Sequence, residues 1–102
     1  LGNLVFVDRL RRQYDPMAIR LGLIEHHYRT EWEWDDGLMD RNTQRLMAWR
    51  ASCEGTSGDV LDAVRERLDD DLDSPGAVAV IDRAAADGES TRAAAELLGV
   101  LL

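Results

Sequence analysis

Residues Asp69–Ala77 read DDDLDSPGA and mark a junction between two helices. An acidic helix end is followed by Asp73, a favoured N-cap residue, and then by Pro75. Proline is tolerated in the first turn of a helix, where no backbone N–H is needed. The stretch therefore predicts one helix that ends near Asp69 and another that runs from Pro75 to about Ala86.

A calcium loop is the other interpretation of these acidic residues. In such a loop the sixth position is glycine and the twelfth is glutamate. Counted from Asp69, these positions hold Ser74 and Val80. We therefore favour a helix junction over a metal site.

The same cap-and-proline signal occurs upstream at Asp15-Pro16, and Asp35, Asp36 and Asp59 are further N-cap candidates. Each precedes apolar residues at helical spacing. We expect helices after Asp15, from about residue 36 to 52, from 59 through 72, from 75 to 86 and from 91 to 102. The apolar positions expected on buried faces include Met17, Ile19, Leu21, Leu23, Ile24, Leu38, Met39, Leu46, Met47, Trp49, Val60, Leu61, Val64, Leu68 and Leu72.

The segments between these helices are short, and Cys53–Gly58 is a linker by composition. Short connections favour antiparallel neighbours in a helical bundle. Only Leu4–Val7, which is β-branched and aromatic, predicts a short extended segment at the N-terminus. The fold class expected is therefore all-α.

The charge of the chain is strongly negative and unevenly distributed. Its 102 residues include 12 Arg and no Lys, against 20 Asp plus Glu, which gives a net charge of −8. Residues 1–30 have a net charge of +2, whereas residues 31–102 have a net charge of −10. Nucleic-acid binding depends on the neutralisation of phosphates, so this balance opposes it. An anionic ligand would be expected near the first third of the chain.

Composition also bears on the cellular compartment. The longest apolar run, Ala77–Ile81, is far shorter than the roughly 18 residues of a membrane span. The single cysteine, Cys53, cannot form an internal disulfide and suits a reducing compartment. No signal-peptide pattern is seen. We therefore expect a cytoplasmic protein without a membrane partner.

Few residues suggest catalysis. His26 and His27 are adjacent and point about 100° apart on a helix, so they cannot hold one metal ion together. Cys53 has no basic residue in the sequence closer than Arg50. The chain has no glycine-rich phosphate loop and no nucleophile elbow. We expect no catalytic residue and no metal ligand in this chain.

The exception is the pair Trp32 and Trp34, which alternates with Glu31 and Glu33. In an extended segment the two indoles would lie on one side. Flat indole faces suit stacking on a sugar or an adenine, and the acids could bind hydroxyls or an ammonium group. The alternative is that both rings fill the junction between two helices.

Four stretches together carry a resemblance to a known family. They are Leu1–Val7, Asp15–Arg20, His27–Arg29 and Asp70–Ala77. Their order and spacing resemble the region that follows the KMSKS loop in the cysteinyl branch of class I aminoacyl-tRNA synthetases. The resemblance implies the C-terminal helical domain of that branch. It divides the chain into residues 1–14, which follow the nucleotide-binding loop, and residues 15–102, the helical bundle.

This branch also contains the cysteine ligases of mycothiol biosynthesis, and Trp32–Trp34 after His27–Arg29 resembles those ligases more than the synthetases. The resemblance implies activation of cysteine with ATP as cysteinyl-adenylate, and then transfer to the amine of glucosaminyl-inositol. The −10 charge of residues 31–102 also favours a small acceptor over tRNA. A fragment of the synthetase and a non-catalytic helical interaction module remain the alternatives.

The resemblance also implies that the family's catalytic motifs are not in this chain. The family's HIGH motif, its KMSKS lysines and its zinc ligands would lie upstream of Leu1, so ATP with Mg²⁺ and zinc would bind there. We expect this chain to be inactive without its catalytic domain. Gly2 and Asn3 would flank the nucleotide loop, and Arg29, Trp32 and Trp34 are candidates for contact with the substrate.

Overall fold

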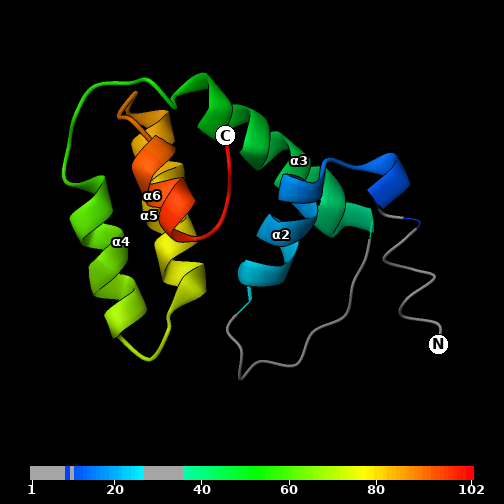
Figure 1. The fold of residues 1–102 in the computed structure, drawn as a ribbon, viewed down its shortest axis with the longest axis horizontal. Helices are drawn as coiled ribbons and strands as arrows, with labels where there is room; N and C mark the ends of the chain where they lie inside the picture. The colour runs from blue at the N-terminus through cyan, green and yellow to red at the C-terminus, as the bar shows by residue number, and fades with distance from the viewer. Residues whose placement is uncertain (1–8, 10, 27–35) are drawn as a thin grey trace.

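The computed structural model describes residues 9, 11–26 and 36–102. The helices labelled in Figure 1 are α2 (Pro16–Ile24), α3 (Asp36–Ala51), α4 (Val60–Asp69), α5 (Ser74–Ala86) and α6 (Arg92–Leu97). Residues 9 and 11–13 are also helical, and these ranges contain no strand. The all-α prediction is confirmed. The predicted extended segment, Leu4–Val7, lies outside the described residues.

The two cap-and-proline signals begin helices as predicted. The Asp15 carboxylate accepts a hydrogen bond of 2.9 Å from the Met17 N–H at the start of α2. The Asp73 carboxylate accepts one of 2.9 Å from the Gly76 N–H at the start of α5. Asp59 also precedes a helix, but its side chain makes no cap hydrogen bond.

The helices form two adjoining groups (Figure 1). α2 packs against α3, while α4 runs antiparallel to α5 and also contacts α6. α3 contacts α5 and so joins the two groups. One continuous core includes side chains from each of these helices. Its large, almost fully buried side chains include Leu21, Met39, Leu46, Trp49, Val64 and Ile81. Burial of such side chains supplies most of the folding free energy.

Uncharged hydrogen bonds join the α3–α4 connection to the α5–α6 turn. The Thr56 N–H donates to the Gly88 carbonyl over 3.0 Å, and the Ser90 N–H donates to the Thr56 carbonyl over 2.7 Å. The hydroxyl groups of Ser52, Ser90 and Thr91 donate to backbone carbonyls over 2.6–2.8 Å. Gly55 permits this approach, because a Cβ there would overlap with the Gly88 carbonyl. We call Ser52, Thr56, Ser90 and Thr91 the neutral junction.

Three apolar residues predicted to be buried are exposed. Met47 is 65% exposed, Leu23 is 53% exposed and Leu72 is 61% exposed. Leu72 lies beyond the end of α4, which stops at Asp69 because the chain turns back toward α5. Asp71 and Leu72 both have positive φ angles in this turn, which a continuing helix does not allow.

The last predicted helix is shorter than expected. α6 ends at Leu97, whereas a helix to Leu102 was predicted. Gly99 has a φ of +79°, a left-handed conformation that ends helices. The chain beyond it returns to α2, where the Arg20 guanidinium donates to the Leu98 carbonyl over 2.9 Å. Val100 is fully buried there.

Candidate functional site

The residues predicted to act on a ligand are Gly2, Asn3, Arg29, Trp32 and Trp34. All five lie outside the described residues, so their roles stay predictions. The described residues nevertheless show how the helices that flank residues 27–35 in the sequence are joined to each other. α2 precedes this segment and α3 follows it.

Glu25 joins the end of α2 to the beginning of α3. Its two carboxylate oxygens accept hydrogen bonds from Nε and Nη2 of Arg41, over 2.7 and 2.9 Å. Paired guanidinium–carboxylate hydrogen bonds of this kind fix orientation as well as distance. The side chain of Glu25 is only 15% exposed.

A second arginine extends this network to α5. Nη1 of Arg45 donates to Glu25 over 3.1 Å, and its Nε donates to the Asp82 carboxylate over 3.0 Å. Asp82 also accepts from the indole Nε1 of Trp49 over 2.8 Å. The amide of the buried Asn42 donates to the Leu38 carbonyl and accepts from Arg45. We call Glu25, Arg41, Asn42, Arg45 and Asp82 the ionic junction.

The arginines keep Glu25 ionised. The hydrogen bond from Arg41, followed by the hydrogen bond and charge of Arg45, lowers the pKa of Glu25 from 4.5 to about 2, while burial acts in the opposite direction. A carboxyl group with this pKa is no proton donor near neutral pH. Glu25 therefore has a structural role, which is to hold α2 against α3 through its two arginine partners.

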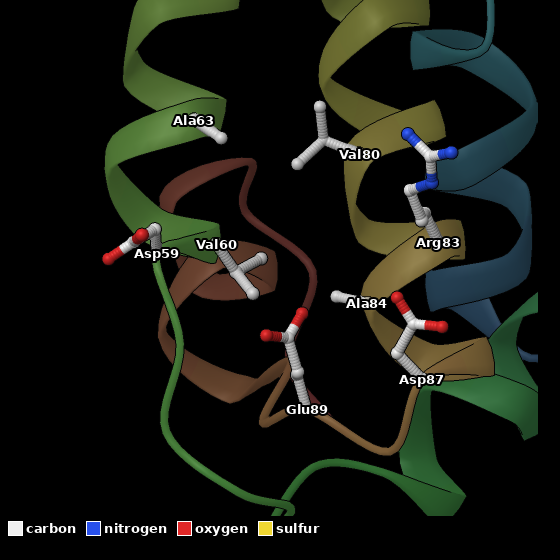
Figure 2. A pocket seen from close by; sticks show the side chains of 8 residues that line it. All are labelled: Asp59, Val60, Ala63, Val80, Arg83, Ala84, Asp87 and Glu89. Carbon is white, nitrogen blue, oxygen red and sulfur yellow. The ribbon is translucent and has the colours of Figure 1, made fainter.

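A pocket lies on the other side of the molecule's core, between α4 and α5 (Figure 2). Its volume is about 280 Å³. The α4 residues Val60 and Ala63 and the α5 residues Val80 and Ala84 give it an apolar lining. Asp59, Arg83, Asp87 and Glu89 add charged groups around it.

Sequence reasoning missed this pocket, because its charged residues come from the start of α4, from α5 and from the turn that follows α5. Arg83 lies on α5, Asp87 is the C-cap residue, and Glu89 follows Gly88 in the turn. Gly58 leaves room for the Glu89 carboxylate, since a Cβ there would overlap with it. No periodic pattern in the sequence brings Gly58 and Glu89 together.

Cys53 has a basic neighbour that the sequence interpretation overlooked. Nη2 of Arg92 lies 3.5 Å from the Cys53 sulfur and also pairs with Glu54. The expectation that Arg50 was the nearest cation is wrong, because the neutral junction brings the start of α6 beside the end of α3.

The described residues do not fit a metal centre. Among them, no group of three or more His, Cys, Asp or Glu side chains could hold a metal ion. His26 instead lies with its Nδ1 3.3 Å from the Gly22 carbonyl. In the same part of the chain, no helix is long and apolar enough to cross a membrane.

Curated relatives are closely similar to this chain. No protein-family model matches it. A protein of Catenulispora acidiphila is 54% identical over 103 residues, which covers 91% of this chain and 24% of the relative. One of Acidothermus cellulolyticus is 59% identical over 80% of the chain, and one of Sanguibacter keddieii is 44% identical over 99%. The matched regions cover 22% of the Acidothermus cellulolyticus protein and 28% of the Sanguibacter keddieii protein.

All three relatives are named L-cysteine:1D-myo-inositol 2-amino-2-deoxy-alpha-D-glucopyranoside ligase. Over its matched residues, the chain belongs to the family of these ligases. It spans about a quarter of the length of these curated relatives. The predicted resemblance to the ligase branch is therefore confirmed, while the division at residue 14 stays a prediction.

Proposed function

We propose that this chain is the C-terminal helical part of a cytoplasmic, ATP-dependent ligase. The whole enzyme would activate cysteine as cysteinyl-adenylate and join it to the amine of glucosaminyl-inositol. The single observation that carries this proposal is an identity of 44–59% to ligases of that name over most of the chain. An identity this high over 80% or more of the chain supports a shared role for the segment.

The role proposed for the described residues is to hold the helices around the 27–35 segment. The ionic junction fixes the end of α2 against the start of α3 and ties both to α5. Precise placement of substrate-binding groups needs such rigid support. In this proposal Arg29, Trp32 and Trp34 contact the amino-sugar substrate, and Gly2 and Asn3 flank the nucleotide loop.

The cofactors are proposed to bind outside this chain. ATP with Mg²⁺ would supply the adenylyl group for activation of the cysteine carboxylate, with pyrophosphate as the leaving group, and zinc would hold the cysteine thiolate. The described residues do not fit a zinc site, because no group of three or more His, Cys, Asp or Glu side chains among them could hold a metal ion. Alone, this chain would therefore be inactive.

The test uses the full-length protein that contains this chain. Supplied with cysteine and ATP, it should form an amide with glucosaminyl-inositol and should not charge tRNA. Formation of cysteinyl-tRNA instead would support the synthetase alternative and overturn the proposal. Within the active enzyme, Trp34→Ala should raise the KM for the amino sugar. An unchanged KM with a lower melting temperature would mean that Trp34 fills a helix junction.

A further inference from the structure

The pocket between α4 and α5 separates positive from negative charge. Figure 2 shows the guanidinium group of Arg83 beside Val80 at the upper right of the pocket. The carboxylates of Asp87 and Glu89 enter from the lower side, whereas Asp59 points away to the left. A ligand in this pocket would therefore meet a cation at one end and two anions at the other.

These three charged groups are available to a ligand. Within the described part of the chain, the side chains of Arg83, Asp87 and Glu89 make no ion pair or hydrogen bond with one another or with other residues. Arginines on other helices do pair with carboxylates. Arg45 on α3 pairs with Asp82, and Arg92 on α6 pairs with Glu54. A cation and two anions around one cavity, each without a partner among the described side chains, favour a ligand that carries both charges.

The backbone at the acidic end of the pocket is held firmly. The Glu89 carbonyl accepts from the Ser52 hydroxyl over 2.6 Å, and the Glu89 N–H donates to the Ala84 carbonyl over 2.9 Å. The Asp87 N–H donates to the Arg83 carbonyl over 3.0 Å. Because these positions are fixed before binding, little ordering would be needed when a ligand enters.

We propose that this pocket binds a free α-amino acid with a small apolar side chain. The carboxylate of the ligand pairs with Arg83, and its ammonium group pairs with Asp87 and Glu89. Its side chain lies on the apolar lining formed by Val60 and Val80. This site is separate from the proposed ligase chemistry, so its test, made on the full-length protein that contains this chain, does not depend on ligase activity.

Charge and size decide between this ligand and others. A basic side chain or a simple amine would leave Arg83 unmatched, and a simple carboxylate would leave both acids unmatched. A volume of about 280 Å³ suits a molecule of amino-acid size and lies at the lower limit of the pockets that hold drug-sized ligands. A free amino acid meets both requirements.

The test compares L-valine with two analogues that each lack one charge. N-acetyl-L-valine has no ammonium group, and L-valinamide has no carboxylate. Titrations followed by backbone amide shifts should show saturable binding of L-valine, centred on residues 60, 83, 87 and 89. Each analogue should bind at least about tenfold more weakly, as expected for loss of a charge-assisted hydrogen bond. No saturation by L-valine up to about 50 mM, or equal binding of valinamide, would overturn the proposal.

Variants of the chain identify the groups that bind. Arg83→Gln and Glu89→Gln should each weaken L-valine binding about tenfold. Arg65→Gln is the matched control, because Arg65 is 60% exposed on α4 and lies outside the pocket. Circular dichroism should show that each variant is folded. If Glu89→Gln does not fold, Asp87→Asn takes its place. Binding unchanged in Arg83→Gln would overturn the proposed orientation and, with it, the proposed site.

Discussion

Two junctions hold this bundle together by different interactions. The ionic junction joins α2, α3 and α5 through carboxylates and guanidinium groups, and Glu25 and Arg45 at its centre are only 15% and 16% exposed. The neutral junction joins the α3–α4 connection to the α5–α6 turn through backbone groups and hydroxyls. Trp49 contacts both junctions, because its indole donates to Asp82 and its carbonyl accepts from Thr91.

The two junctions should respond differently to salt and to pH. Charged pairs weaken when salt screens them or when acid protonates the carboxylates. Hydrogen bonds between uncharged groups respond little to either. The ionic junction joins the two helices that precede and follow residues 27–35 in the sequence, so we expect acid or salt to loosen the attachment of these helices.

The largest effect is expected where the two junctions meet. Trp49→Ala removes a fully buried side chain and one hydrogen bond to Asp82, so it should lower the free energy of unfolding by about 3–5 kcal/mol. Urea denaturation followed by circular dichroism measures this change. Met47→Ala on the same helix is the control, because Met47 is 65% exposed and its loss should change stability by less than about 0.5 kcal/mol. Equal effects of the two substitutions would contradict a core centred on Trp49.

The next largest effect should come from the centre of the ionic junction. Glu25→Gln removes the carboxylate that pairs with Arg41 and Arg45, although Arg45 keeps its pair with Asp82, and we expect a loss of about 2 kcal/mol in the free energy of unfolding at low salt. The loss should be smaller in 1 M salt, because the wild-type pairs are then partly screened.

Asp62→Asn is the matched control for Glu25→Gln. Its pair with Arg65 spans 3.9 Å, and the Asp62 side chain is 83% exposed. Pairs of this kind contribute little to stability. If Asp62→Asn destabilised the protein as much as Glu25→Gln does, the ionic junction would contribute no more to stability than an exposed ion pair.

Acid should act through the same carboxylate. Arginine pairing lowers the pKa of Glu25 from 4.5 to about 2, so its ionised form stabilises the folded state. This contribution is fully present above pH 4.5 and is lost as the pH falls toward 2. We expect Glu25→Gln to remove about 1–2 kcal/mol of the stability change across that range, measured by urea denaturation at several pH values. An identical pH profile in Glu25→Gln and wild type would contradict the assigned pKa.

The smallest effect is expected at the neutral junction. Thr91→Val keeps the shape of a fully buried residue but removes its 2.7 Å hydrogen bond to the Trp49 carbonyl, so it should cost about 1 kcal/mol. The loss should be the same in low and high salt. Arg92→Gln nearby is the control and should leave the melting temperature unchanged, because its pair with Glu54 is exposed. A salt-dependent loss in Thr91→Val would remove the distinction between the junctions.

Local signals in the sequence predicted the helices well where a cap begins them. Asp15 and Asp73 accept the hydrogen bonds that their positions predicted. Apolar spacing predicted less about burial, since Met47 and Leu72 are exposed. Their exposure depends on how far a helix continues and on what packs against it, and neither is a property of a short stretch of sequence.

The junctions and the pocket could not be predicted from local patterns. Arg45 and Asp82 are 37 residues apart in the sequence, as are Ser52 and Glu89. Only the packing of α3 on α5 brings the first pair together. Ser52 and Glu89 meet where the neutral junction holds the α3–α4 connection against the α5–α6 turn. The residues predicted to contact substrate lie outside the described ranges, so the candidate site rests on the resemblance and on the relatives' names.

The most direct test of the central claim measures cysteine-dependent exchange of pyrophosphate into ATP. The assay compares this 102-residue chain with the full-length protein that contains it. We expect rapid exchange by the full-length protein and none above background by the chain alone. Exchange by the isolated chain would contradict the claim that it is one part of a ligase whose catalytic residues lie elsewhere.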